Sequence, residues 1–413
     1  MLTPTPTPTL TIDPARLWQS HLDMARIGPT PEGGSNRPAL SAPDAEARAL
    51  LLHWTAPLNL TLERDAIGNL FLHRPGTDPA RPAIAFGSHL DTVPTGGRFD
   101  GTFGVLAGLE LLRTLQNTPT KAPLELVVWT NEEGSRFPPA MMGSRVHAGT
   151  LPLETALATQ DDEGTTVAEA LVDHAQLGLT RPAPRNWAAW LEPHIEQGPI
   201  LESTNTPIGI VTATVQARYF QLTLTGAPSH VGPTTMDRRQ DSLAAAAEII
   251  LATERLGQQA EPQGRTSAAW IQNHPNVRGA VPAQTRLHLD LRHTDPAQAA
   301  TMEAHLREAI TKITTSRRIH AHIDPYATFG PVTFDPTLNA LLRTQAAARG
   351  LTTQDLIAAA GHDSVLIAPL CPSAMLFVPS QAGITHNPAE YTAPEHLAQG
   401  AQLLLDTVLH LAM

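Results

Sequence analysis

Hydrophobic and polar positions follow two different patterns along the chain. Residues 83–86 and 124–130 are short apolar runs between turn residues, and such runs are typical of strands buried in a parallel sheet. Residues 105–116, which lie between these two runs, have the apolar spacing of a helix. The order strand, loop, helix, strand therefore predicts an α/β domain.

Residues 212–328 have a different pattern. They predict a β-α-β-β-α-β order, with strands at 219–225, 266–273, 285–292 and 318–324 and helices at 241–256 and 296–315. This order is the split βαβ plan of a ferredoxin-like sandwich. Beyond it the α/β pattern resumes, with a helix at 337–350, a strand at 374–378 and a helix from residue 394 to the end. We therefore expect the α/β domain to be interrupted by an inserted domain.

The expected boundaries follow from these patterns. Residues 13–211 and 329–413 would form the two parts of the α/β domain, with residues 212–328 as the insert. Helices are predicted at 14–27 and 43–55, and strands at 65–73 and 208–215. Residues 1–12 are rich in alternating Thr and Pro, offer little apolar surface to bury, and predict a disordered tail.

Length, charge and cysteine content narrow the function. A chain of 413 residues is long for one domain, and its formal net charge of −11 argues against nucleic acid or an anionic membrane as a partner. The single cysteine, Cys371, excludes an intramolecular disulfide and a thiolate metal cluster. We find no apolar run of membrane-spanning length and no signal peptide, so we expect a cytoplasmic protein.

Imidazoles and carboxylates gather where the predicted strands end. Residues two apart on a strand point to the same side, so Asp91 is predicted to accept a hydrogen bond from the ring of His89. His194 and Glu196 repeat this spacing. Active sites of open α/β sheets lie at the carboxyl ends of strands. The other polar residues that follow predicted strands are Asp100, Glu132, Glu133 and His386.

Each of these features has an ordinary structural explanation when it is taken alone. An isolated His-x-Asp and a pair of exposed acids are common, and 18 histidines make single coincidences easy. Taken together, five nitrogen and oxygen ligands without a thiolate suit two borderline divalent ions such as Zn, Mn or Co. Because neighbouring strand residues face opposite ways, one of Glu132 and Glu133 could bind metal while the other faces a nucleophilic water.

The sequence resembles the di-metal amidohydrolases related to zinc aminoacylases and carboxypeptidase G. Within them it is similar to N-carbamoyl-L-amino-acid hydrolase, allantoate amidohydrolase and β-ureidopropionase. The resemblance spans nearly the whole chain and implies a phosphorylase/hydrolase-like catalytic domain with an inserted dimerisation or lid domain. The matching motifs are GGSNR (33–37), GSHLDTVPTGGRFDG (87–101), NEEGSRF (131–137), HIEQGP (194–199), GAPSHVGPTTMDRRQD (226–241), GHDS (361–364) and VPSQAGITHNPAE (378–390).

The resemblance also implies a role for each residue. His89 and His194 would share one metal, Glu133 and His386 the other, and Asp100 would bridge the two ions. Glu132 would be the general base, with Asp91 beside it in the catalytic site. From the inserted domain, His230 would reach the scissile carbonyl oxygen, from a partner subunit of a homodimer, and Arg292 would hold a substrate carboxylate. Further implied substrate contacts are Gln197, Asn276 and Gly383.

Two departures from the family pattern bear on the substrate. Gly279 stands where relatives have a second Asn that helps to grip the substrate, and HVGPTTM replaces HAGTTPM after His230. We therefore keep an aminoacylase or dipeptidase of the same superfamily as the alternative to a ureido hydrolase. A non-catalytic dimeric scaffold is a third interpretation, which the complete set of ligands disfavours.

Overall fold

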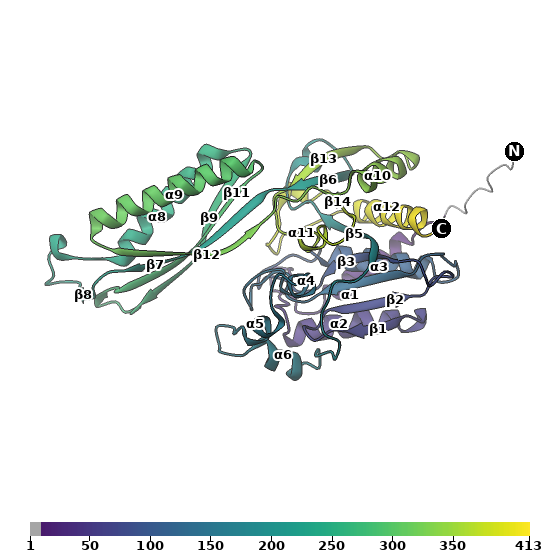
Figure 1. The fold of residues 1–413 in the computed structure, drawn as a ribbon, viewed down its shortest axis with the longest axis horizontal. Helices are drawn as coiled ribbons and strands as arrows, with labels where there is room; N and C mark the ends of the chain where they lie inside the picture. Colours follow the sequence, from purple (N-terminus) through teal and green to yellow (C-terminus); the bar gives the residue numbers. More distant parts are fainter. Residues whose placement is uncertain (1–9) are drawn as a thin grey trace. The chain divides into compact units, whose positions relative to one another are not determined.

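The computed structural model describes residues 10–413 and divides them into two compact units. The first unit consists of the residues up to Thr212 together with 333–356 and 361–413. The second unit consists of Ala213–Val332 and the short segment Ile357–Ala360. Both units combine helices with a sheet, so the chain is a mixed α/β protein (Figure 1).

The first unit is built on an eight-stranded sheet. Four neighbouring strands in its middle, β4, β3, β5 and β14, run parallel, and antiparallel strands flank them. In sheet order the strands are β1 (Thr61–Arg64), β2 (Leu70–Arg74), β4 (Leu124–Trp129), β3 (Ala83–His89), β5 (Trp187–Ile195), β14 (Ser373–Val378), β6 (Ile208–Thr214) and β13 (Thr353–Ala358). The parallel strands are buried along almost their whole length, as their apolar runs predict.

Helices cover this sheet through apolar side chains. The largest core joins sheet residues to α1 (Pro14–Met24), α2 (Ala42–Thr55), α3 (Thr102–Thr114), α10 (Pro336–Ala348) and α12 (Pro394–Ala412). A separate aromatic cluster includes Phe71, Trp129, Trp187 and Trp190. The remaining short helices are α4 (Met142–His147), α5 (Leu153–Ala158), α6 (Val167–Asp173), α7 (Ile200–Ser203) and α11 (Ser364–Ile367), with 3-10 turns η1 (Ala56–Leu58) and η3 (Gln381–Gly383).

The second unit is a four-stranded antiparallel sheet with two long helices on one face (Figure 1). Its strands lie in the order β12 (His320–Phe329), β7 (Gln216–Thr225), β11 (Gln284–His293) and β9 (Gly264–His274). Along the chain they alternate with α8 (Ser242–Ala260) and α9 (Pro296–Arg317), which gives the predicted β-α-β-β-α-β order. A small ribbon pairs β8 (Ser229–His230) with β10 (Ala280–Val281), and η2 (Met236–Arg238) lies near it in sequence.

Alternation along β11 explains why this second sheet has one covered face. Leu287, Leu289 and Leu291 are fully buried against the two helices, whereas the residues between them are half-buried on the other face. This is the period-two pattern of an antiparallel sheet that is packed on one side.

The N-terminal region differs from its prediction. Residues 1–9 of the expected tail lie outside the described residues, but Leu10 and Ile12 pack against the core of the first unit. Ile12 is 3% exposed, and its backbone N–H donates to Gln402 Oε1, so the apolar side chain docks in the core. Of the strand expected at 65–73, only residues 70–73 are strand, within β2; residues 65–69 form the turn from β1, where Asp65 accepts from the backbone of Asn69.

From residue 10 to the C-terminus, none of the helices combines the length and the apolar composition needed to cross a lipid bilayer.

Candidate metal centre

The four parallel strands end in the polar residues that the sequence singles out. His89 is the last residue of β3, and His194 is the next-to-last residue of β5. Glu132 and Glu133 follow β4, and His386 follows β14 after a short loop. Since the carboxyl ends of parallel strands meet at one edge, these side chains lie together although they are distant in sequence.

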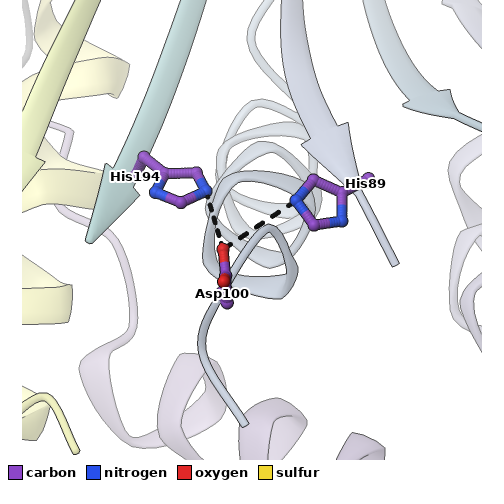
Figure 2. Close-up of side chains that lie close together, drawn as sticks. All are labelled: His89, Asp100 and His194. Carbon is purple, nitrogen blue, oxygen red and sulfur yellow. Dashed lines mark ion pairs between the residues drawn. The ribbon is translucent and has the colours of Figure 1, made fainter. Parts of the chain in front are cut away.

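One group of possible ligands consists of His89, Asp100 and His194, and all three are buried. Asp100 Oδ1 lies 3.2 Å from His194 Nε2 and 3.9 Å from His89 Nε2. Figure 2 shows the two imidazoles pointing from their strands toward the carboxylate between them. One atom from each side chain lies within 4.8 Å of the other two, which is the spacing needed to surround one ion.

A second group consists of Asp100, Glu133 and His386. His386 Nε2 lies 3.1 Å from Asp100 Oδ2 and 3.3 Å from Glu133 Oε2. Asp100 therefore belongs to both groups, with one carboxylate oxygen directed to each. The groups differ in exposure, because the His386 side chain is 49% exposed whereas every member of the first group is buried.

The hydrogen bonds of the histidines fit metal binding. His89 Nδ1 lies 2.9 Å from the backbone oxygen of Asp91, and His194 Nδ1 lies 2.9 Å from that of Ile195. A carbonyl oxygen can only accept, so each Nδ1 must carry a proton, and when the ring is neutral its Nε2 lone pair is the one available to a metal. Three imidazoles and two carboxylates without sulfur suit a borderline divalent ion such as Zn, Mn or Co.

Charges in the centre shift the pKa values of its members. Burial would raise the pKa of Asp100, but hydrogen bonds from His194 and His386 hold it well below its ordinary value. Hydrogen bonding to Asp100 raises the pKa of His386 to about 9, and the same carboxylate outweighs burial to raise that of His194 to about 9. Burial raises the pKa of Glu133 to about 8.

Glu132 lies beside the first group without belonging to either. Its Oε2 is 3.6 Å from His89 Nε2, and the residue is only 8% exposed. Burial, followed by the nearby carboxylates of Asp363 and Glu133, raises the pKa of Glu132 well above its ordinary value. A carboxylate held in this way readily takes up a proton.

The carboxylates two residues after His89 and His194 do not bond the histidine rings as predicted. The Asp91 carboxylate does not pair with the His89 ring, whose Nδ1 is 3.9 Å away and bonds the Asp91 backbone oxygen instead. It accepts the backbone N–H groups of Glu132 and Glu133 at 3.2 and 3.1 Å. The Glu196 carboxylate likewise turns away from His194 to accept the first N–H groups of α7. Both carboxylates bond backbone N–H groups in place of the imidazoles that the strand spacing suggested.

Two side chains hold Asp100 in place. Gln197 Nε2, predicted to contact substrate, donates to Asp100 Oδ2 at 2.9 Å. Sequence reasoning gave no role to Glu390, which is 1% exposed and accepts the backbone N–H groups of Phe99 and Asp100. The one sequence feature that pointed to Glu390 was its place at the end of the motif VPSQAGITHNPAE (378–390). Gly97 is required here, because a Cβ would lie 2.0 Å from the Glu390 carboxylate.

The structure places the other predicted residues in different surroundings. Gly383 belongs to the first unit, with φ +66°, and a Cβ there would lie 2.8 Å from Pro199 N. His230, Asn276 and Arg292 belong to the second unit. His230 and Asn276 are exposed, whereas Arg292 forms an ion pair with its neighbour on the strand. The structure therefore brings the five predicted ligands and Glu132 together within one unit.

Comparisons with known proteins identify the family of this chain. Residues 85–410 match Peptidase family M20/M25/M40. The chain is 39% identical over 399 residues to an N-carbamoyl-L-amino-acid amidohydrolase of Rhizobium meliloti, covering 96% of each chain. It is 32% identical over 393 residues to an allantoate amidohydrolase of Bacillus subtilis (strain 168), covering 94% of this chain and 95% of the relative.

A similar solved structure is that of an amidase of the hydantoinase/carbamoylase family from Burkholderia vietnamiensis. It superimposes with a TM-score of 0.95 at 39% identity, covering 98% of each chain. These findings confirm the resemblance on which the predicted roles rest. The chain belongs to peptidase family M20/M25/M40, whose enzymes depend on metal ions.

Proposed function

We propose that this protein is a di-metal amidohydrolase that cleaves a C–N bond of a ureido group in a small substrate with a carboxylate. The observation that carries the proposal is the pair of ligand groups that share Asp100, with Glu132 beside them but in neither. The similarity to carbamoyl-amino-acid and allantoate amidohydrolases supports the choice of a ureido substrate.

In this proposal His89 and His194 hold one ion, Glu133 and His386 hold the other, and Asp100 contacts both. Divalent ions bound there would lower the pKa of a water molecule toward neutrality and polarise the substrate carbonyl. The chain supplies imidazole nitrogens and carboxylate oxygens for this purpose, so we expect Zn, Mn or Co.

Glu132 moves the proton. It takes a proton from the attacking water, whose oxygen bonds the carbamoyl carbon, and later gives that proton to the departing nitrogen. For an N-carbamoyl amino acid, consumption of one water yields ammonia, carbon dioxide and the free amino acid. Burial of Glu132 limits its contact with bulk water and raises its pKa above the ordinary value, which makes it a stronger proton acceptor.

His230 would act as a hydrogen-bond donor to the substrate carbonyl oxygen. Its Nδ1 accepts the backbone N–H of Gly232 at 3.0 Å, so a neutral ring must carry its proton on Nε2. A donor at that nitrogen would stabilise the negative charge that develops on the oxygen. We propose that the His230 of a partner copy completes each site.

Arg292 would hold the substrate carboxylate. Its Nε and Nη2 bond Asp290, its Nη2 also bonds Tyr219 Oη at 3.1 Å, and its Nη1 bonds the Ala359 oxygen at 2.8 Å. Of the five guanidinium N–H groups, one on Nη1 is left without a partner among residues 10–413. The guanidinium is thus fixed in orientation and keeps one donor for a ligand.

We propose that a second copy of the chain pairs with the second unit. β9 is an edge strand of its sheet, and Trp270 and Ile271 on it are 40% and 45% exposed. Leu251 on the adjoining α8 is 51% exposed. An edge strand with exposed apolar side chains is a natural pairing surface. An active monomer by light scattering at micromolar concentration would contradict this proposal.

The test of function is ammonia release from a panel of N-carbamoyl amino acids, N-carbamoyl-β-alanine and allantoate, with release of the free amino acid from N-acyl amino acids and dipeptides measured in parallel. We expect turnover of a ureido compound that stops when a chelator removes metal and returns with Zn, Mn or Co. Preference for acyl substrates would favour an aminoacylase or dipeptidase instead. Metal binding without turnover of any of these substrates would favour a scaffold. The expected cytoplasmic location is a further prediction, to be checked by cell fractionation.

A further inference from the structure

A buried carboxylate that belongs to neither ligand group lies behind the metal centre. Glu192 on β5 is 1% exposed, and its partners are two serines. Ser88 Oγ donates to its Oε1 at 2.8 Å. The backbone N–H and the Oγ of Ser364 both donate to its Oε2, at 3.0 and 2.5 Å. Three donors from two distant segments thus converge on one side chain.

Two members of this network lie close in the chain to the histidines of the metal centre. Ser88 precedes His89 on β3, and Glu192 precedes His194 by two residues on the neighbouring parallel strand β5. Residues two apart on a strand project to the same side, so Glu192 stands on the side of β5 from which His194 also projects. The bond from Ser88 to Glu192 therefore ties the two histidine-bearing strands together close to their ligands.

Ser364 extends the tie to the GHDS segment, to which the proposed reaction gives no role. His362 of this segment packs edge-on against the His194 ring, with 4.5 Å between the ring centroids. Trp190 Nε1, also on β5, donates to Ser364 Oγ at 2.7 Å. Glu192 thereby fixes the segment that backs the His194 imidazole.

Burying the Glu192 carboxylate costs folding free energy. A carboxylate removed from water loses its hydration, and only well-made hydrogen bonds compensate for that loss. Apolar residues of similar size would fill the space without this cost. The side chain does, however, set the spacing of two strands through directed bonds, which an apolar contact cannot do as tightly.

We propose that Glu192 is a positioning residue for the metal centre, which through Ser88 and Ser364 fixes the separation of His89 and His194. The inference rests on the proposed function, because it assumes that these histidines bind an ion. Residues that orient ligands in this way typically change metal affinity ~10–100-fold when they are removed.

The experiment compares E192A and S88A with a matched control, E125A. Glu125 is a buried carboxylate of the same sheet, on β4, that accepts Trp187 Nε1 at 2.7 Å, but it lies at the amino end of its strand. Metal-free wild type and variants are titrated calorimetrically with Mn²⁺ and with Zn²⁺, and their melting is followed by circular dichroism. We expect the first ion that binds to E192A and to S88A to bind ~10–100-fold more weakly than the first ion that binds to wild type. E125A should bind this ion with wild-type affinity.

A conservative variant supplies the rescue. In E192Q the amide oxygen can accept both Ser364 donors while the amide nitrogen donates to Ser88 Oγ, so we expect nearly normal metal affinity. If E192A does not fold, S88A and S364A each cut one arm of the network and carry the test. Normal affinity in these variants, or an equal loss in E125A, would overturn the proposal. A wild-type protein that binds no ion would instead refute the metal centre itself, and the positioning role with it.

Discussion

Replacing Glu132 by Gln tests the division of labour between two adjacent carboxylates. The structure places Glu133 in a ligand group and Glu132 outside both groups, 3.6 Å from the His89 ring. Gln keeps the size of the side chain but cannot accept a proton at neutral pH. Glu132→Gln should therefore remove proton transfer and leave every ligand atom in place.

The expected loss is large and confined to kcat. General base catalysis contributes roughly 10²–10⁴-fold, which corresponds to about 3–5 kcal/mol of transition-state stabilisation. Stability should change in the opposite direction. Burial and neighbouring carboxylates raise the pKa of Glu132 in the folded protein. Ionisation of Glu132 therefore destabilises the metal-free protein once the pH exceeds the pKa that this residue has in the unfolded chain. The variant should melt at or above the wild-type temperature at pH 8.

The assays are steady-state ammonia release, metal content by atomic absorption and melting of the metal-free protein. The matched control is Glu133→Gln, which removes a ligand oxygen and should lose one of the two ions. If Glu132→Gln loses an ion while Glu133→Gln keeps both, the two roles are reversed. If Glu132→Gln retains more than about a tenth of wild-type kcat, another group takes the proton.

Three further predictions follow from the same geometry. A chelator should remove the ion of the half-exposed His386 group before the ion of the buried His194 group. Release should be faster at pH 6 than at pH 8, because protons compete with the metal for imidazoles whose pKa is about 9. Equal release rates of the two ions, measured by atomic absorption, would contradict this order. Arg292→Lys should cost about 1.5–3 kcal/mol in kcat/KM on carboxylate substrates, since the three donors of Lys cannot replace the bonds to Asp290, Tyr219 and Ala359 and also meet the substrate, and unchanged kinetics would exclude Arg292 from recognition. Gly279→Asn should fold normally, because a Cβ there meets nothing within 4 Å, and should raise turnover of a simple N-carbamoyl-L-amino acid; no change would place residue 279 outside the substrate site.

Several candidate ligands could be recognised from sequence because they follow strong local patterns. His89 and Glu133 end or follow buried apolar strands, and parallel strands bring their carboxyl ends together regardless of separation along the chain. The same reasoning gave the order of the second unit, where Leu287, Leu289 and Leu291 alternate with polar residues. Periodicity and strand direction indicate these positions and the order of the elements, whereas the role expected of each site residue came from the family resemblance.

The layer behind the ligands could not be predicted because it depends on contacts without a sequence pattern. Glu390 holds the Asp100 backbone across 290 residues, and Glu192 accepts from Ser364 across 172. Strand spacing placed Asp91 on the side of His89 but could not show that nearby backbone N–H groups would capture its carboxylate. Free N–H groups of a tight turn are strong donors, and only the folded path of the chain reveals where they point.

The electrostatics of the centre provide an argument for bound ions that is independent of family membership. Burial raises the pKa of Asp91 to about 7, of Glu390 to about 7 and of Glu133 to about 8, and it also raises the pKa values of Glu132 and Asp363 well above their ordinary values. So many acids share one buried region at a cost in folding free energy unless positive charge enters it. Two divalent ions would supply that charge where Asp100 faces both groups. Binding of the ions and stability of the first unit must then be linked, since whatever binds only the folded state stabilises it.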